Sequence, residues 1–407
     1  MKKLLILGGT KNQVPLIQAA KNEGYYVIVC DWTTTNPGIA LADKHYQVST
    51  LDYDAVIDVA RKEKIDGIIS NSEPAMMNVA RVAEELKLIG NSVHSIEQLS
   101  SKDLFRKLQK ESCEFAPKHF STKDIKEFLY RANAFDYPVI VKPAENSGTR
   151  GTKKIDRYDE KTLIASFEEC VSLSRNGKCA IEEYVEMPKH TVIEGEVFVN
   201  NHCFFWEGFF STERSELAPM IPMTYSMPLR LPPQKMDKIK STLSKLFLNA
   251  GIRHGEYNVE LYFTKSGDVF VIEINVRQGG NYLPDLVAKH CGVDMYRLLI
   301  TTVVGDNKYW NEVMSNRNPF KKYVTRHAVF SHQTGKYMGV SIEDTIKRYI
   351  TSISEQKAIG DRVDICRNGS DLISLIDFEF PDVEMQHYYK DRMESMVIPI
   401  VVEDRTR

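Results

Sequence analysis

Residues 259–275 read VELYFTKSGDVFVIEIN, and this stretch decides the fold. Two runs rich in β-branched and aromatic residues flank Ser266-Gly267, a pattern typical of a β-hairpin with a two-residue turn. Such a turn places Glu260 directly opposite Glu273, with their Cβ atoms about 5 Å apart. Two carboxylates at that separation repel each other unless one is protonated or a cation lies between them.

The second strand of this hairpin carries further polar residues. Side chains on a strand return to the same face at every second residue, so Glu273, Asn275 and Arg277 are expected to project together. Two carboxylates and an amide oxygen suit Mg²⁺ or Mn²⁺, which also hold phosphate oxygens. The arginine beside them is placed to neutralise charge on a transferred group. The alternative is an exposed face with solvated charges, but the apolar residues that flank Glu273 favour a buried strand.

Two upstream segments also carry candidate binding groups. Residues 139–143 (VIVKP) predict a buried strand with Lys142 near its end, and SGTRGT follows at 147–152. A Gly/Ser/Thr run can turn its backbone N–H groups toward a phosphate, although most such runs are only turns and this one lacks the GK[ST] ending of a Walker A loop. Lys102, at the start of a predicted helix, strengthens the phosphate interpretation. Residues 180–185 (AIEEYV) end a strand with two acids, a common surface pattern.

The amino-terminal segment predicts a different kind of domain. Residues 1–90 alternate short apolar runs with helix patterns, which indicates parallel βαβ units. Gly8-Gly9-Thr10 follows the first strand and Asp31 ends the second, as in a dinucleotide site. However, Thr10 and Gln13 stand where such a site needs its second and third glycines, which disfavours an NAD(P)-dependent enzyme.

Length and composition bound the remaining possibilities. A chain of 407 residues corresponds to two or three domains at about 150 residues each. A net charge of −2 gives no sign of a nucleic-acid or membrane partner. Seven scattered cysteines favour reduced thiols in the cytosol, so a metal is expected on oxygen ligands. The proline-rich residues 211–233 predict a long loop or lid, and residues 342–353 an amphipathic helix.

Taken in this order, these segments resemble the ATP-grasp superfamily over nearly the whole chain, most specifically at residues 260–280. Within it, the chain looks most like the carboxylate–amine ligases, such as L-amino acid ligase and, more distantly, the carbamoyl-phosphate synthetase large subunit. The resemblance implies an α/β fold with an α+β nucleotide domain. Its expected units are a Rossmann-like parallel α/β domain at 1–100, an ATP-grasp domain at 101–310 with a β-rich lid at about 117–187, and a C-terminal α+β domain at 311–407.

The resemblance also implies a role for each matching position. Lys102 and Lys142 would bind the phosphates of the nucleotide. Ser147, Gly148, Thr149 and Gly151 would belong to the loop over the triphosphate, and Glu182, Glu183 and Val185 to the adenine-binding hinge. Bridging Mg²⁺ or Mn²⁺ ions would be held by Glu260, Glu273 and Asn275. Arg277 would stabilise the acyl phosphate and the tetrahedral intermediate. The candidate substrate residues are Glu73, Arg214, Gly279 and Gly280, although Glu73 is equally explained as a helix-start acid and Arg214 as a structural arginine.

Two positions depart from the family pattern. Lys189 stands where relatives often carry a ribose-binding glutamate, so ribose recognition is in doubt or falls to another group such as Glu194. Asn258 stands where the family often has a histidine, which affects the substrate pocket more than the metal site.

The expected function is a cytoplasmic, ADP-forming carbon–nitrogen ligase that joins a small carboxylate to an amine through an acyl phosphate. Its partners would be ATP, Mg²⁺ and the two small-molecule substrates, with a homodimer as a candidate assembly and no nucleic acid or membrane. The alternatives are an ATP- and bicarbonate-dependent carboxylase and a non-catalytic nucleotide-binding module.

Overall fold

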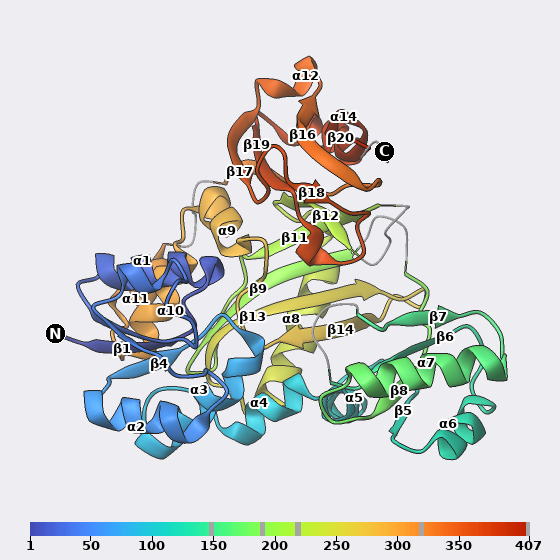
Figure 1. Cartoon of the computed structure of the whole chain (residues 1–407), viewed down its shortest axis with the longest axis horizontal. Coiled ribbons are helices and arrows are strands. Elements are labelled where there is room, and N and C mark those ends of the chain that lie inside the picture. Colours follow the sequence, from blue (N-terminus) through green and yellow to red (C-terminus); the bar gives the residue numbers. More distant parts are fainter. Residues whose placement is uncertain (146–149, 188–191, 216–220, 317–320, 404–407) are drawn as a thin grey trace.

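The computed structural model describes residues 1–145, 150–187, 192–215, 221–316 and 321–403. A large sheet occupies the centre, and the amino-terminal domain, a smaller sheet and the carboxyl-terminal segment surround it (Figure 1). No helix within the described ranges is long and apolar enough to cross a membrane.

The amino-terminal domain is a parallel α/β unit, as predicted. Its sheet has the order β3-β2-β1-β4, and its elements are β1 (Lys3–Leu7), α1 (Val14–Asn22), β2 (Tyr26–Cys30), β3 (Lys44–Tyr46), α2 (Tyr53–Glu63), β4 (Gly67–Ile69) and α3 (Met76–Leu86). Because side chains alternate along a strand, Leu4 and Ile6 pack in the core that includes α1, while Leu5 and Leu7 pack in the core that includes α2 and α3. Both faces of this sheet are therefore buried.

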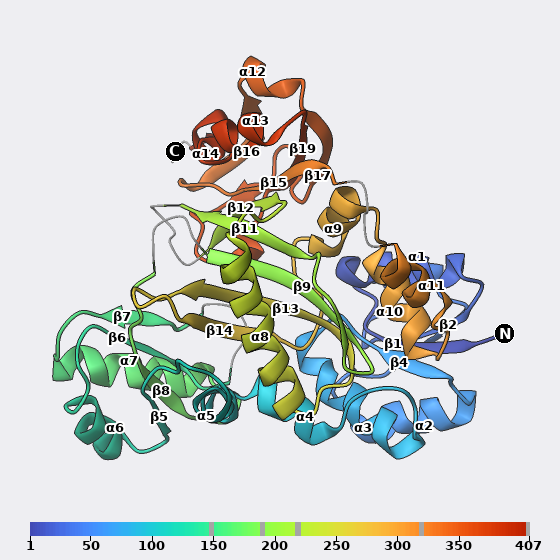
Figure 2. The same cartoon turned by 180° about the vertical axis from the view of Figure 1, so that it is seen from behind.

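The central sheet has nine strands in the order β14-β13-β9-β11-β12-β15-β19-β17, and β10 pairs with β9. The strands are β9 (Val192–Asn200), β10 (Cys203–Phe205), β11 (Phe209–Arg214), β12 (Pro222–Met227), β13 (His254–Phe263), β14 (Val269–Asn275), β15 (Tyr323–Val329), β17 (Ile350–Glu355) and β19 (Ser374–Phe380). Helix α8 (Pro233–Asn249) lies across one face of this sheet (Figure 2). Tyr257, Val259 and Leu261 pack in the core that contains α8, so the alternate residues Asn258 and Glu260 face the other side.

Two predictions made from local pattern are wrong. Residues 211–233 are not a continuous loop, because β11 and β12 are inner strands of the central sheet. The prediction was wrong because it took the prolines of this segment as a sign of a loop. Pro222 is the first residue of β12 and Pro228 follows the end of that strand, and at these positions a proline does not remove a hydrogen bond that the sheet needs. Residues 342–353 contain only the short helix α12 (Asp344–Lys347), and β17 then pairs with β19.

The segment predicted as a lid forms a separate antiparallel sheet in the order β5-β8-β6-β7. Helices α4 and α5 connect it to the amino-terminal domain (Figure 1). The elements are α4 (Val93–Ser100), α5 (Lys102–Ser112), β5 (His119–Thr122), α6 (Ile125–Ala132), β6 (Val139–Pro143), β7 (Lys153–Ile155), α7 (Glu160–Leu173) and β8 (Cys179–Glu183).

The last third of the chain is divided between two places. Helices α9 (Leu283–Cys291), α10 (Met295–Val303) and α11 (Lys308–Ser315) lie toward the amino-terminal domain, where α10 shares a core with α1. Strands β15, β17 and β19 extend the central sheet. The remaining strands, β16 (Gly335–Ile342), β18 (Arg362–Val363) and β20 (Val397–Val402), form a small sheet in the order β18-β16-β20. Helix α14 (Met393–Met396) contacts β20, and α13 (Val383–Lys390) contacts β15 and β19 of the central sheet.

Candidate functional site

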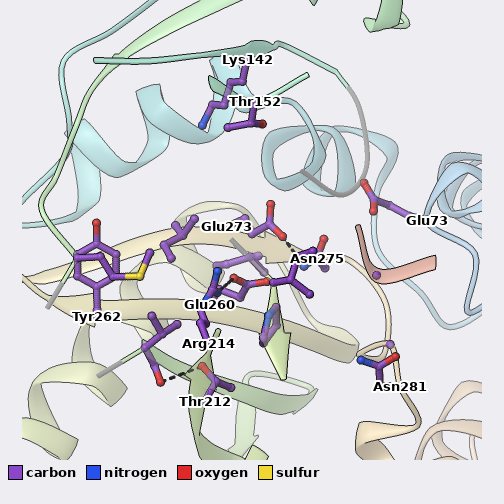
Figure 3. Close-up of a pocket in the computed structure, with 18 of the residues that line it drawn as sticks. Glu73, Lys142, Thr152, Thr212, Arg214, Glu260, Tyr262, Glu273, Asn275 and Asn281 are labelled. Carbon is purple, nitrogen blue, oxygen red and sulfur yellow. Dashed lines mark hydrogen bonds and ion pairs between the residues drawn. The ribbon is translucent and has the colours of Figure 1, made fainter. Parts of the chain in front are cut away.

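A cavity of about 1220 Å³ lies between the lid and the central sheet. Figure 3 shows Lys142 and Thr152 on its lid side, facing Glu260 and Glu273 on the hairpin. The predicted site residues that line it come from all parts of the chain and are Glu73, Lys102, Lys142, Glu182, Glu183, Val185, Arg214, Glu260, Glu273, Asn275 and Gly280. The structure thus gathers most of the predicted residues around one space.

The pairing of Glu260 with Glu273 is confirmed, although the turn is not the predicted one. Thr264 pairs with Asp268 around a three-residue loop in which Gly267 has φ +84°. This loop shifts the ladder by one residue, and a β-bulge at Ile272 shifts it back before Glu273. Two deviations from a regular hairpin therefore cancel at the position of the two carboxylates.

The two carboxylates have different neighbours. Glu260 accepts a hydrogen bond from Arg214 at 3.0 Å, and Glu273 accepts one from Asn275 at 3.0 Å. Burial raises the pKa of Glu260, and the negative charge of Glu273 raises it further. A cation beside the two carboxylates would favour their charged forms. Arg214, a candidate substrate residue, holds a carboxylate of the protein in this structure.

The donor set fits a hard cation. Asn275 uses its amide nitrogen to donate to Glu273 and to Asn258, so its oxygen is the atom that it can offer to a ligand. Within the described ranges, no three His, Cys, Asp or Glu side chains are grouped to hold a metal ion. A cation would therefore depend on Glu260, Glu273 and the Asn275 amide, which are oxygen ligands of the kind that Mg²⁺ accepts.

The two positions that depart from the family pattern have different outcomes. Asn258 donates to Glu196 at 2.9 Å and accepts from Asn275, so it links the predicted metal face to a buried carboxylate that sequence reasoning missed. Glu194 lies directly opposite Glu260 on β9 and is only 3% exposed, and it is not among the residues that line the cavity. Lys189 lies outside the described residues.

Lys142 and Glu182 form a buried ion pair on the lid side. The Lys142 ammonium lies 2.5 Å from the Glu182 carboxylate, and burial lowers the pKa of Lys142 to about 8. Arg106, which the sequence analysis did not single out, donates to both oxygens of Glu182 at 3.0 and 3.3 Å. Its spacing of four residues from Lys102 on one helix was an available signal. The predicted adenine contact of the Glu182 side chain stays a prediction, and its carboxylate already has these partners.

Some predicted residues lie elsewhere. Arg277 donates to the Gln278 carbonyl at 2.8 Å, and its guanidinium lies 3.9 Å from Glu73, beside the cavity wall but not among the residues that form it. Gly151 has φ +77° and packs against Leu173, also away from the cavity lining. Ser147, Gly148 and Thr149 lie outside the described residues, so their predicted role over the triphosphate is not described.

Gly279, a candidate substrate residue, makes a close contact within the protein. Its N–H donates to both oxygens of Glu196, at 3.1 and 3.0 Å. A Cβ atom there would lie 2.2 Å from Glu196 and 2.9 Å from the Asn258 amide. The close approach is thus made to a buried carboxylate of the protein.

Replacing Gly279 by alanine is expected to lower the free energy of unfolding by about 1–3 kcal/mol, because buried side chains must move to admit the methyl group. The matched control is Gly280→Ala, because a Cβ atom at Gly280 meets nothing within 4 Å. Chemical denaturation of both variants measures the difference. Equal stability of the two variants would show that the Gly279 contact is unimportant.

The carboxyl-terminal segment forms one end of the cavity, which the sequence analysis did not predict. Gln356, Lys357 and Ser370 line it. Lys11 of the amino-terminal domain donates to the Gln356 side chain at 2.9 Å, so this domain meets the carboxyl-terminal segment beside the cavity. Residues from distant segments therefore face the same cavity.

Comparison with known proteins agrees with this architecture. Residues 4–94 match the family described as PylC-like, N-terminal domain, and residues 100–301 match carbamoyl-phosphate synthase L chain, ATP binding domain. A curated relative, the carbamoyl phosphate synthase large chain, C-terminal section, of Aquifex aeolicus (strain VF5), is 24% identical over 324 residues, which cover 75% of this chain and 58% of the relative. The chain thus spans little more than half the length of that relative.

Solved structures share the fold at low sequence identity. L-amino acid ligase from Bacillus licheniformis matches with a TM-score of 0.80 and 17% identity, covering 99% of each chain. Phosphoribosylglycinamide synthetase from Anaerococcus prevotii matches with a TM-score of 0.73 and 21% identity, covering 98% of this chain and all of the other. The family matches, together with this shared fold, show that the chain belongs to the ATP-grasp superfamily.

Proposed function

We propose that the protein is an ATP-dependent ligase that joins a small carboxylate to an amine through an acyl phosphate, with release of ADP and phosphate. The observation that carries the proposal is the Glu260–Glu273 pair, which lies in one cavity with Lys142. Two carboxylates that can hold a divalent metal ion, Glu260 and Glu273, therefore face the Lys142 ammonium, which can bind a phosphate group. This is the arrangement that phosphoryl transfer from ATP to a carboxylate requires.

The chemical difficulty of this reaction is electrostatic. A carboxylate is a poor electrophile, and both the carboxylate and the triphosphate are anionic. Mg²⁺, held by Glu260, Glu273 and Asn275, would supply positive charge that screens this repulsion. Lys142 and Lys102 would bind the phosphate oxygens, and Arg277 would stabilise the oxyanion that forms when the amine attacks.

The same cavity offers a place for the base of the nucleotide. Phe270, Tyr262 and Ile272 line it next to the hinge residues Glu183 and Val185. The Tyr262 hydroxyl donates to the Val185 carbonyl at 2.7 Å, which fixes the hinge against the central sheet. Aromatic and aliphatic side chains in a cavity wall suit a flat heteroaromatic ring.

The test is the substrate dependence of ADP release in the presence of Mg²⁺. A panel of carboxylates and amines is combined with ATP, and amide formation is followed by mass spectrometry. ADP release that requires both substrates supports the proposal. Release that requires bicarbonate and no amine would identify a carboxylase, and ATP binding without ADP formation across the panel would identify a nucleotide-binding module.

The lysine assignment gives a separate prediction. Lys142→Ala is expected to weaken Mg-ATP binding by about 10- to 100-fold, because a charge-assisted hydrogen bond contributes about 1.5–3 kcal/mol. Lys153→Ala is the matched control, because Lys153 lies on the same lid but pairs at the surface with Glu169. Equilibrium binding measures both affinities. Unchanged ATP affinity in Lys142→Ala would remove Lys142 from the nucleotide site.

A further inference from the structure

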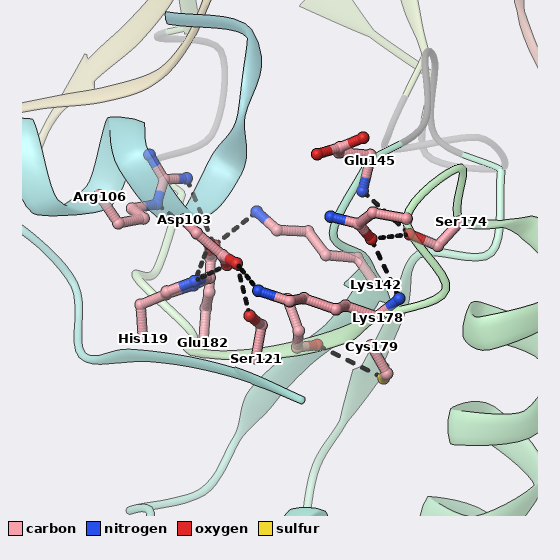
Figure 4. A network of polar contacts seen from close by, with 12 residues as sticks. Asp103, Arg106, His119, Ser121, Lys142, Glu145, Ser174, Lys178, Cys179 and Glu182 are labelled. Carbon is pink, nitrogen blue, oxygen red and sulfur yellow. Dashed lines mark hydrogen bonds and ion pairs between the residues drawn. The ribbon is translucent and has the colours of Figure 1, made fainter. Parts of the chain in front are cut away.

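His119 on β5 lies between two carboxylates (Figure 4). Its Nε2 atom is 2.7 Å from Asp103 on α5, and its Nδ1 atom is 3.0 Å from Glu182 on β8. Only the imidazolium has an N–H on both nitrogens, so only the charged ring can donate to both carboxylates at once. A neutral ring would direct a lone pair at one of them.

The charged groups around His119 come from three elements other than its own strand. Helix α5 supplies Asp103 and Arg106, β8 with the turn before it supplies Glu182 and Lys178, and β6 supplies Lys142. Burial opposes the charged form of His119, but the hydrogen bonds and negative charges of Asp103 and Glu182 outweigh it and raise its pKa. Ser121, on the same strand as His119, adds only a neutral hydroxyl that donates to Asp103 at 2.7 Å.

Glu182 connects this histidine to the nucleotide site. One oxygen of Glu182 faces His119 and Arg106, and the other accepts from Lys142 at 2.5 Å. We propose that His119 is a positioning residue. Its imidazolium holds the Glu182 carboxylate in place, so that the Lys142 ammonium remains available to interact with the phosphates of ATP. This inference rests on the proposed nucleotide site.

The physical reason is charge balance in a buried place. Glu182 is 3% exposed, so its charge needs compensation by the protein. When His119 is charged, Arg106 and His119 balance the negative charge of Glu182, so Glu182 does not depend on Lys142 as its counter-ion. With His119 neutral, the group loses one positive charge, Glu182 holds Lys142 more strongly, and the positive potential at the cavity falls.

The test measures equilibrium binding of Mg-ATP at saturating Mg²⁺ from about pH 5.5 to about pH 8.5, a range that spans histidine titration. Wild-type affinity is expected to fall as the pH rises in two steps, a histidine step as His119 loses its proton and a lysine step as Lys142, with a pKa of about 8, loses its own. His119→Gln is expected to bind about tenfold more weakly at the acidic end and to lack the histidine step. Asp103→Asn is expected to move the histidine step to lower pH, because it removes one of the carboxylates that raise the pKa of His119.

The matched control is His332→Gln, because His332 also contacts a carboxylate, Glu394 at 2.8 Å, but at the surface. It is expected to keep the wild-type profile. Ring ¹⁵N chemical shifts provide a direct readout, with His119 expected to carry protons on both nitrogens at neutral pH. The inference is overturned if His119→Gln binds Mg-ATP with wild-type affinity and both pH steps, or if Asp103→Asn leaves the histidine step in place. A wild-type protein that binds no Mg-ATP at any pH would instead overturn the nucleotide site itself.

Discussion

Replacement of Glu273 by glutamine is expected to lower ATP turnover by about 10³-fold, because it removes half of the negative charge that faces the proposed cation. Glutamine keeps the size of the side chain and its hydrogen bond with Asn275, so the loss is one of charge. The same change removes the repulsion of Glu260, to which Glu273 lies directly opposite. The metal-free variant is therefore expected to be at least as stable as the wild type.

Two measurements separate these effects. Steady-state ADP release is recorded over a range of Mg²⁺ concentrations, and the free energy of unfolding is measured without metal. Glu379→Gln is the matched control, because Glu379 lies on the same central sheet but pairs with Lys322 near the surface. Wild-type turnover of Glu273→Gln in Mg²⁺ would show that the metal assignment is wrong.

The hairpin shows how much of the fold and the site the sequence could predict. The alternation of apolar and acidic residues around Glu260 and Glu273 indicated a half-buried sheet with its acids on one face, and α8 covers the opposite face. The pairing of Glu260 with Glu273 was predicted from a two-residue turn, and that turn is wrong. A three-residue loop and a bulge at Ile272 together give the same pairing, so the predicted partners are correct although the predicted turn is not.

The parts that sequence reasoning missed depend on contacts between distant segments. Glu196 and Arg106 each bond to residues more than 60 positions away in the chain, and of the two only Arg106, one helical turn from Lys102, carried a local signal. Lys357 lines the cavity because β17 joins the central sheet, where periodicity predicted a helix. Sequence reasoning therefore found most of the residues that line the cavity, and it missed those whose position depends on contacts between distant elements.

Replacement of Asp377 by asparagine is expected to lower the free energy of unfolding by about 3–5 kcal/mol, because it leaves the Arg326 charge buried without its counter-ion. Asp377 on β19 accepts from Arg326 on β15 with both oxygens, at 2.6 and 2.7 Å, and both side chains are about 95% buried. Arg326 also donates to the carbonyls of Asn281 and Tyr282, whose φ angles of +52° and +54° are costly for residues with a Cβ atom. The pair therefore fixes a strained segment at the cavity wall.

The pH dependence gives this prediction a second test. Burial raises the pKa of Asp377, but the hydrogen bonds and charges of Arg326 and, to a smaller extent, Lys289 outweigh it and lower the pKa below its ordinary value. The stability that the pair provides is thus present above the unfolded-state pKa of about 3.9 and is lost as the pH falls through the lower folded-state value. The difference in unfolding free energy between wild type and Asp377→Asn should shrink in acid.

Two further variants decide whether the buried charge or the loss of contacts is responsible. Asp344→Asn, at an exposed pair with Lys347, is the surface control and should leave the unfolding free energy unchanged. The double variant Arg326→Leu/Asp377→Leu removes both charges and should cost less than Asp377→Asn if the unpaired guanidinium causes the loss. A double variant that is less stable than Asp377→Asn would instead assign the stabilisation to the bonds that Arg326 makes with Asn281 and Tyr282. In that case the main role of Arg326 would be to hold the cavity wall.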